Sequence, residues 1–311
     1  MRASHATAYG LALGYLGDLL TGDPRRGHPV AAFGRAAAAL ERRLWRDHRA
    51  AGVLHTALCV GGTAAGAAAL AGLTRGHAGR GAVTAMAAWA VLGGTSLARE
   101  ARGLGDALAA GDVARARELL PRLCGRDPLS LDEPALARAV VESVAENTSD
   151  AVVGALVWGA IAGVPGLAAF RAVNTLDAMV GHLSPRYRRF GWASARLDDL
   201  AGWPGARLTA VLATVAGPRP RAAARVWRAD AHRHPSPNAG PVEAAFAGAL
   251  GVRLGGTLSY GGRVEHRPVL NAAGRPVDFA DIDRAIRLSR RIGTLTLAAC
   301  CAASYAREAR R

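Results

Sequence analysis

The segment around which this chain is organised begins with V-E-S-V-A-E-N-T-S-D (Val141 to Asp150). It continues through apolar sequence to N-T-L-D (Asn174 to Asp177) and closes with Y-R-R-F-G-W-A-S-A-R-L-D-D (Tyr187 to Asp199). Carboxylates, amides and arginines therefore stand beside sequence that is hydrophobic enough to enter a membrane. Because polar groups at membrane depth are costly, we expect these residues to be functional.

The composition indicates a membrane protein. Hydrophobic residues make up 50% of the 311 residues and cluster in long runs, although the net charge is +15. A basic balance fits anionic lipid or anionic substrates. Nucleic acid is the weaker interpretation, because the arginines are spread over many loops and no nucleic-acid-binding motif is visible. The chain has no lysine, which excludes a Schiff-base lysine and a phosphate-binding P-loop.

We therefore expect a mainly α, polytopic helical membrane protein with about four to six apolar segments and polar loops that face the cytoplasm. The apolar segments are residues 6–20, 51–73, 81–98, 151–171, 206–217 and 291–306. Residues 51–73 and 81–98 are predicted to form a transmembrane hairpin, since their connection is too short for a domain. Residues 33–50 are predicted to form an amphipathic helix at the membrane interface.

We treat residues 1–311 as a single integral-membrane domain. Its polar loops are residues 21–50, 99–150, 172–205 and 218–290. The four cysteines include no C-x-x-C pair, so we expect free thiols rather than disulfides or metal ligands. The glycine pairs Gly255-Gly256 and Gly261-Gly262 indicate tight turns.

Residues 151–171 have two alternative structures. They form either one unbroken span or two short helices in a re-entrant hairpin that turns at G-V-P-G (Gly163 to Gly166). Broken helices are tolerated at membrane depth where they line a polar cavity. The loops on both sides are rich in arginine, and the positive-inside rule therefore favours the hairpin.

We predict that the helix before this segment begins at Asp132 or Glu133. It carries three carboxylates at a regular spacing. Glu142, Glu146 and Asp150 recur at i, i+4 and i+8, which predicts that they share one helical face. Like charges at this spacing repel each other, and either Mg²⁺ or arginines would relieve the repulsion. Asn147 lies alongside and adds an oxygen ligand. A solvated acidic face is the alternative.

Two further groups of polar residues follow. Asn174 and Asp177 share a helical face, and the arginines after them are predicted to bind phosphates or carboxylates through their guanidinium forks. The residues of this second group are Arg186, Tyr187, Arg188, Arg189, Arg196, Asp198 and Asp199. An interfacial anchor of aromatic residues and arginines is the alternative for the group at 186–192.

Two more loops complete the candidate site. Asp23 and His28 lie in T-G-D-P-R-R-G-H-P-V (Thr21 to Val30), which we place in a loop at the membrane edge. Ser236 and Asn238 precede a short helix predicted over Val242 to Leu250, where backbone N–H groups can bind a phosphate. From the residues alone, the reaction class is open between a phosphotransferase, a prenyl transferase and an ATP-driven ligase.

These motifs, together with R-A-V-N-T-L-D-A-M-V-G (Arg171 to Gly181) and S-P-N-A-G-x-x-E-A-A (Ser236 to Ala245), resemble the CobD/CbiB family. These proteins are membrane-bound adenosylcobinamide-phosphate synthases of cobalamin biosynthesis. The resemblance covers nearly the whole chain in the order of the family. It implies ATP- and Mg²⁺-dependent amide formation between adenosylcobyric acid and (R)-1-aminopropan-2-ol or its O-phosphate.

The resemblance also assigns roles to the candidate residues. Metal ligands are Glu142, Glu146, Asn147 and Asp150. Catalytic residues are Glu142, Glu146, Asp177, Asp198 and Asp199. Residues for ATP and substrate are Asp23, His28, Asn174, Arg186, Tyr187, Arg188, Arg189, Arg196, Ser236 and Asn238.

The expected location is the bacterial inner or plasma membrane, with several spans and an active site that faces the cytoplasm. The expected partners are the corrinoid, the amine, ATP and the bilayer, together with a second copy of the chain or other late enzymes of the pathway. Two alternatives stand beside this expectation: a membrane phosphotransferase or prenyl transferase with an acidic Mg²⁺ site, and a non-enzymatic corrinoid-binding membrane component.

Overall fold

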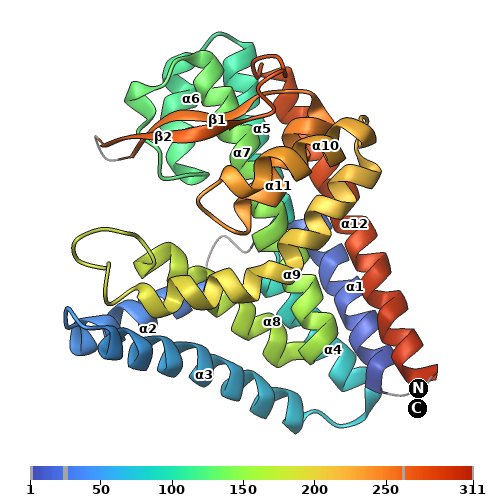
Figure 1. Cartoon of the computed structure of the whole chain (residues 1–311). Helices are drawn as coiled ribbons and strands as arrows, with labels where there is room; N and C mark the ends of the chain where they lie inside the picture. The colour runs from blue at the N-terminus through green and yellow to red at the C-terminus, as the bar shows by residue number, and fades with distance from the viewer. Residues whose placement is uncertain (1–2, 24–26, 261–262, 310–311) are drawn as a thin grey trace. The chain divides into compact units, whose positions relative to one another are not determined.

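The computed structural model describes residues 3–23, 27–260 and 263–309, and these residues are mainly α-helical (Figure 1). The chain divides into two compact units. The first unit is Met1–Gly93, Asp150–Gly205 and Thr296–Arg311, and the second unit is Gly94–Ser149 and Ala206–Leu295. The predicted fold class is confirmed. We predicted a single domain and did not foresee its division into two units.

Three stretches of the described residues are long and apolar enough to cross a membrane: Arg49–Leu73, Gly76–Ala109 and Glu133–Val180. In the most apolar window of Arg49–Leu73 only 11% of the residues are buried within the protein. Side chains this apolar and this exposed suit contact with lipid. The range of about four to six apolar segments stays a prediction, because length and composition alone do not fix the number of spans.

Apart from connecting loops and most of the π-helix Ser149–Val153, the described part of the first unit consists of α-helices. They are α1 (Ala3–Thr21), α2 (Pro29–Leu44), α3 (Arg49–Leu73), α4 (Gly76–Val91), α8 (Gly154–Val180), the start of α9 (Trp192–Ala216) and the end of α12 (Ala280–Ala309). α1 and the end of α12 lie side by side (Figure 1), and the rings of His5 and Tyr305 are 4.7 Å apart.

Small residues let α1 pack closely against α4. A Cβ atom at Gly10 or Gly14 would overlap Thr84 and Ala88 of α4. Glycines one turn apart allow close approach in the same way between helices in lipid. The predicted hairpin of residues 51–73 and 81–98 is therefore wrong in its pairing, because α4 packs mainly on α1 and α3 packs mainly on α8. The second segment also breaks at Leu92-Gly93, where α4 ends and the next helix begins.

Helix α8 is a hairpin of two arms. At Gly163 the backbone adopts φ 62° and ψ −143°, which interrupts the helix before Pro165. Cβ atoms added at Gly154 and Gly159 would meet Phe170 and Leu167 of the second arm. Residues 16 positions apart in a straight helix would lie about 24 Å apart, so the arms must run antiparallel. The hairpin is confirmed, and the unbroken span is wrong.

The amphipathic helix predicted for residues 33–50 begins earlier and ends earlier in the structure than predicted. Helix α2 begins at Pro29, where the His28 side chain accepts a hydrogen bond from the Val30 N–H (3.1 Å), and it ends at Leu44. Ala37 and Glu41 are its buried residues. α3 begins at Arg49 after the extended His48, which separates it from α2.

The second unit combines helices with one β-hairpin. Its elements are α5 (Gly94–Ala109), α6 (Val113–Leu119), α7 (Glu133–Thr148), α10 (Pro220–Asp230), α11 (Ala239–Leu250), β1 (Leu254–Tyr260) and β2 (Arg263–Leu270), with the remaining parts of α9 and α12. α7 begins as predicted, because Asp132 accepts a hydrogen bond from the Ala135 N–H (3.0 Å). α11 contains the predicted short helix.

The β-hairpin was not predicted, because its glycine-rich sequence indicated only turns. β1 pairs antiparallel with β2, and the register shifts at a bulge between Leu254 and Gly256. Gly255 (φ 77°) and Gly256 (φ 89°) adopt backbone conformations that other residues rarely reach. The turn predicted at Gly261-Gly262 lies outside the described residues. The four cysteines are free, as predicted.

Candidate active site

The second unit contains a buried ion pair at its centre. Glu142 of α7 pairs with Arg126, and the two side chains are 1% and 6% exposed. The other Glu142 oxygen accepts a hydrogen bond from the backbone N–H of Gly255 (2.6 Å). The solvated acidic face is therefore wrong for Glu142, whose charge is compensated inside the protein by an arginine.

Two further groups from α11 and the loop before it join this ion pair. Glu243 forms a side-chain hydrogen bond with Glu146, and its carboxyl oxygen lies 3.7 Å from Nε2 of His234. Burial, and next the negative charge of Glu146, raise the pKa of Glu243 well above its usual range. Burial lowers the pKa of His234. Burial thus favours the neutral forms of Glu243 and His234.

The four predicted metal ligands do not form a metal cage in this arrangement. Glu142 is occupied by Arg126 and Gly255, and the Asn147 amide donates to the Ser143 carbonyl (2.9 Å). The α-helix also changes to a π-helix at Ser149–Val153. This change shifts Asp150 off the predicted face and into the first unit. Among the described residues, no three His, Cys, Asp or Glu side chains are placed to hold a metal ion together.

A second group of carboxylates lies in the first unit. Asn174 on the second arm of α8 is hydrogen-bonded to Asp198 on α9, and the charges of Asp177 and Asp199 act on the same carboxyl. Burial, and next the charge of Asp177, raise the pKa of Asp198 to about 7. Asp199 also pairs with Arg196 at 3.3 Å. The fold therefore brings together five residues that the sequence analysis selected.

The arginine loop between α8 and α9 is held by acidic residues near α2. Arg186 donates to Glu41 (2.9 Å) and stacks on Trp45, with its guanidinium carbon 4.7 Å from the ring centroid. The Tyr187 hydroxyl donates to the same carboxylate (3.0 Å). This arrangement matches the alternative of an aromatic and arginine anchor. Glu41 was not selected from the sequence, because it appeared to be one charge among many on an amphipathic helix.

The other arginines of this loop differ in their surroundings. Arg189 lies 3.7 Å from Asp47, and both side chains are more than half exposed. Such an exposed pair contributes little to stability. Arg188 is exposed. Both guanidinium groups are accessible to an anion in solution.

The first loop is close to an arginine that the sequence analysis passed over. Asp23 lies 3.8 Å from His28. The charges of Asp23 and Asp150 act on Arg171 of α8. Arg171 stands in the quoted R-A-V-N-T-L-D motif, next to an apolar segment, and an ionisable residue there is itself a functional signal.

The loop before α11 satisfies its own backbone. The Ser236 hydroxyl accepts from the N–H groups of Asn238 (3.3 Å) and Ala239 (3.1 Å). The Asn238 side chain accepts from Arg207 (3.1 Å). The N–H groups that we expected to bind a phosphate are therefore used within the loop. Glu243 follows in the same S-P-N-A-G-x-x-E motif, and its position in that motif was the signal that could have identified it.

Comparison with known proteins gives a consistent result. The family profile described as CobD/Cbib protein matches residues 11–289. The chain is 57% identical over 287 residues to the cobalamin biosynthesis protein CobD of Mycobacterium tuberculosis, covering 91% of each chain. It is 45% identical over 281 residues to the CobD protein of Geobacter metallireducens (87% of this chain and 88% of the relative). It is 42% identical over 286 residues to that of Rhodobacter capsulatus (90% of each). No solved structure matches the chain.

Proposed function

The chain belongs to the CobD/CbiB family, and on this premise we propose that it is an enzyme of cobalamin biosynthesis that forms an amide bond on a corrinoid. The observation that carries the proposal is the match of the family profile from residue 11 to residue 289. The relatives that cover about 90% of the chain are each named a cobalamin biosynthesis protein. The substrates that we propose are adenosylcobyric acid, ATP, and (R)-1-aminopropan-2-ol or its O-phosphate.

The proposed reaction has two steps. The free propionate of the corrinoid attacks the γ-phosphorus of ATP, which yields an acyl phosphate and ADP. The amine nitrogen then attacks the acyl carbon, a C–N bond forms, the C–O bond to phosphate breaks, and inorganic phosphate leaves. Because only the free amine is a nucleophile, the ammonium form must first lose a proton to a base.

Asp198 has the properties that this base requires. A carboxyl group with a pKa of about 7 is partly ionised at neutral pH and is close to the optimum for a general base. Asn174 holds the Asp198 carboxyl by a hydrogen bond, and Asp177 and Asp199 keep its pKa raised. In the proposal, Asp198 accepts the proton, and these three residues position it and adjust its basicity.

The buried group of the second unit has a different proposed role. The pair Arg126–Glu142 fixes α7 to the β1 bulge at Gly255. Glu243, whose pKa is raised by burial, is hydrogen-bonded to Glu146 and lies 3.7 Å from His234. This group offers a proton store that is shielded from water, where electrostatic effects are stronger than at a surface.

In the proposed reaction, Mg²⁺ binds only together with ATP. Mg²⁺ commonly binds through substrate phosphates and keeps several waters. The predicted ligands do not fit a bound ion, since Glu142 is already paired with Arg126 and Asp150 lies within the π-helix Ser149–Val153. We therefore assign no step to a metal ion held by α7. The metal would neutralise charge on the ATP phosphates during transfer.

The membrane setting follows from the apolar helices, and its finer details are part of the proposal. Three candidate spans support a protein that is embedded in a bilayer. We propose a multi-pass protein of the bacterial inner or plasma membrane whose site faces the cytoplasm, where ATP is available. Association with a second copy or with other late enzymes of the pathway stays a proposal of the same kind.

The test is direct detection of the product. Purified protein in detergent is incubated with adenosylcobyric acid, ATP, Mg²⁺ and either amine, and the amide is identified by its mass. We expect an amide only when all components are present, and no product from Asp198→Asn. Corrinoid binding without ATP turnover would instead favour the non-enzymatic corrinoid-binding component.

A further inference from the structure

A cavity of about 570 Å³ opens in the second unit between α7, β1 and the loop after β2. Its walls include Asp132 directly before α7, Arg138 of α7, Arg253, and Gly255 to Thr257 of β1. Small-molecule sites commonly enclose about 300–1,000 Å³. The cavity is therefore large enough for a metabolite or a nucleotide, and none of the predicted site residues lines it.

The two arginines of this cavity have hydrogen-bond donors that the protein itself does not use. Arg138 gives one N–H to the Thr257 carbonyl (3.0 Å), while its buried Nε makes no hydrogen bond. The backbone of Arg253 is fixed by the Arg275 carbonyl (2.8 Å). Its exposed guanidinium has no ion pair with any residue that the structure describes. Asp132 is the acidic residue of the wall, and its carboxylate already caps α7.

The glycines of the bulge keep Arg138 accessible. A Cβ atom at Gly256 would lie 3.4 Å from Nη1 of Arg138, so a side chain there would crowd the guanidinium. The neighbouring Gly255 also lines the cavity, and its N–H donates to Glu142 (2.6 Å). The β1 bulge thus contacts both the cavity and the buried Glu142.

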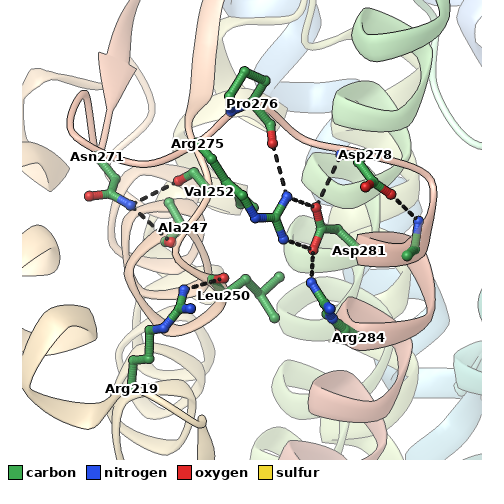
Figure 2. Close-up of polar contacts among 11 residues, drawn as sticks. Arg219, Ala247, Leu250, Val252, Asn271, Arg275, Pro276, Asp278, Asp281 and Arg284 are labelled. Atoms are coloured by element: carbon green, nitrogen blue, oxygen red, sulfur yellow. Dashed lines mark hydrogen bonds and ion pairs between the residues drawn. The ribbon is translucent and has the colours of Figure 1, made fainter.

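The loop that closes the cavity is fixed by a buried carboxylate. Asp281 is fully buried and accepts two hydrogen bonds from Arg275 (2.6 Å each) and one from Arg284 (2.9 Å) (Figure 2). The Asp278 N–H adds another (3.0 Å). Pro276 and Val277, which follow Arg275 directly, line the cavity. A wall held in this way is preorganised and loses little freedom when a ligand binds.

We propose that this cavity binds the phosphate group of a small phosphorylated ligand through Arg138 and Arg253. Guanidinium groups match phosphate in geometry and charge. Only the identity of the ligand rests on the proposed function. That function supplies two sources of phosphate, which are ATP and the O-phosphate of 1-aminopropan-2-ol. The binding claim itself rests on the cavity and its two arginines.

The test measures binding of three probes to the full-length protein in detergent by calorimetry. The probes are inorganic triphosphate, ATP and 1-aminopropan-2-ol O-phosphate. We expect Arg253→Gln to weaken at least one probe by about 10-fold or more, as for loss of a hydrogen bond to a charged group. Arg287→Gln is the control, because Arg287 is exposed on α12 and does not line the cavity.

A second pair of variants separates charge from shape. Val269 is 36% exposed and lines the cavity from β2. Val269→Glu places a negative charge at the phosphate site, and Val269→Gln has the same size without the charge. We expect the Glu variant to bind the same probe about 10-fold more weakly than the Gln variant.

The outcomes distinguish the ligand and the two proposals. An effect on ATP and triphosphate alone identifies a nucleotide site, and an effect on the amine phosphate alone identifies the site of that substrate. If the wild-type protein forms no amide but Arg253→Gln weakens binding of a probe, the proposed function is wrong and the proposal of a phosphate-binding cavity still holds. Unchanged binding in both Arg253→Gln and Val269→Glu, or no binding of any probe, would overturn the cavity proposal whether or not the protein forms the amide.

Discussion

The buried pair Arg126–Glu142 gives the sharpest test of the second unit. We predict that Glu142→Gln lowers the free energy of unfolding by about 3 kcal/mol, near the lower end of the 3–5 kcal/mol for breaking a buried ion pair. The glutamine keeps the size of the side chain and its bond to the Gly255 N–H, so the loss arises from the charge. Arg126 is left in the interior without its main counter-ion, at a side-chain exposure of 6%.

The lower end of the range follows from the neighbours of the pair. The charge of Arg126 also acts on Glu146 and Glu243. When Glu142 is neutral, the charge of Arg126 favours ionisation of Glu243, and this partly replaces the missing charge. At about 2–4 °C per kcal/mol for a domain of 150–250 residues, ~3 kcal/mol corresponds to a fall in melting temperature of about 6–12 °C.

The assay is thermal unfolding of the protein in detergent, followed by tryptophan fluorescence. Glu118→Gln is the matched control, because Glu118 pairs with Arg115 at the surface (2.8 Å, with side chains 67% and 53% exposed). We expect the control to shift the melting temperature by less than about 2 °C. The double variant Arg126→Met with Glu142→Gln should recover most of the loss, since no charge is then left unpaired. A single variant as stable as the control, or a double variant no better than the single, would refute the reasoning.

Three further predictions concern other positions. Asp198→Asn should abolish amide formation. It should also stabilise the protein by up to about 4 kcal/mol at pH 8 but not at pH 4, because the raised pKa of Asp198, about 7, makes wild-type stability fall as the pH rises from about 4 to 7. Equal pH profiles of melting temperature in the variant and the wild type would contradict this. Glu243→Gln should weaken the fall in stability with rising pH, because burial raises the pKa of Glu243 and wild-type stability is lost as that carboxyl ionises; a melting temperature that changes with pH in the same way in the variant and the wild type would argue against this. Gly163→Ala should lower stability by about 1–2 kcal/mol because φ is 62° at the turn of α8, and an unchanged melting temperature would mean that the arms do not require this turn.

The sequence already determined the helical class, the start of α7 and the break in α8. These features depend on local chemistry. Asp132 followed by Pro134 marks a helix start wherever it occurs, and Gly163 with Pro165 interrupts a helix without help from distant residues. The pairing of α1 with α4 was not predictable in this way, because Gly10 and Gly14 permit close packing but do not select a partner.

The candidate site was likewise predictable only in part from the sequence. Asn174, Asp177, Asp198 and Asp199 were selected from the sequence. The hairpin of α8 brings the first two of these residues to the other two on α9. The spacing of Glu142, Glu146 and Asp150 suggested a metal site, but that inference assumed a regular α-helix. The π-helix at Ser149–Val153 breaks the spacing, and the partners of the remaining carboxylates come from residues far along the chain.

What only the tertiary structure decided is which charge compensates each buried carboxylate. Carboxylates crowded on an apolar segment must find cations, protons or hydrogen-bond donors, since burial of an unpaired charge is too costly. That requirement can be stated from the sequence. Its solution here is Arg126 and the Gly255 N–H for Glu142, and a hydrogen bond with Glu243 for Glu146. These partners lie 16, 113 and 97 positions away from the carboxylates that they serve, and only the folded chain brings them together.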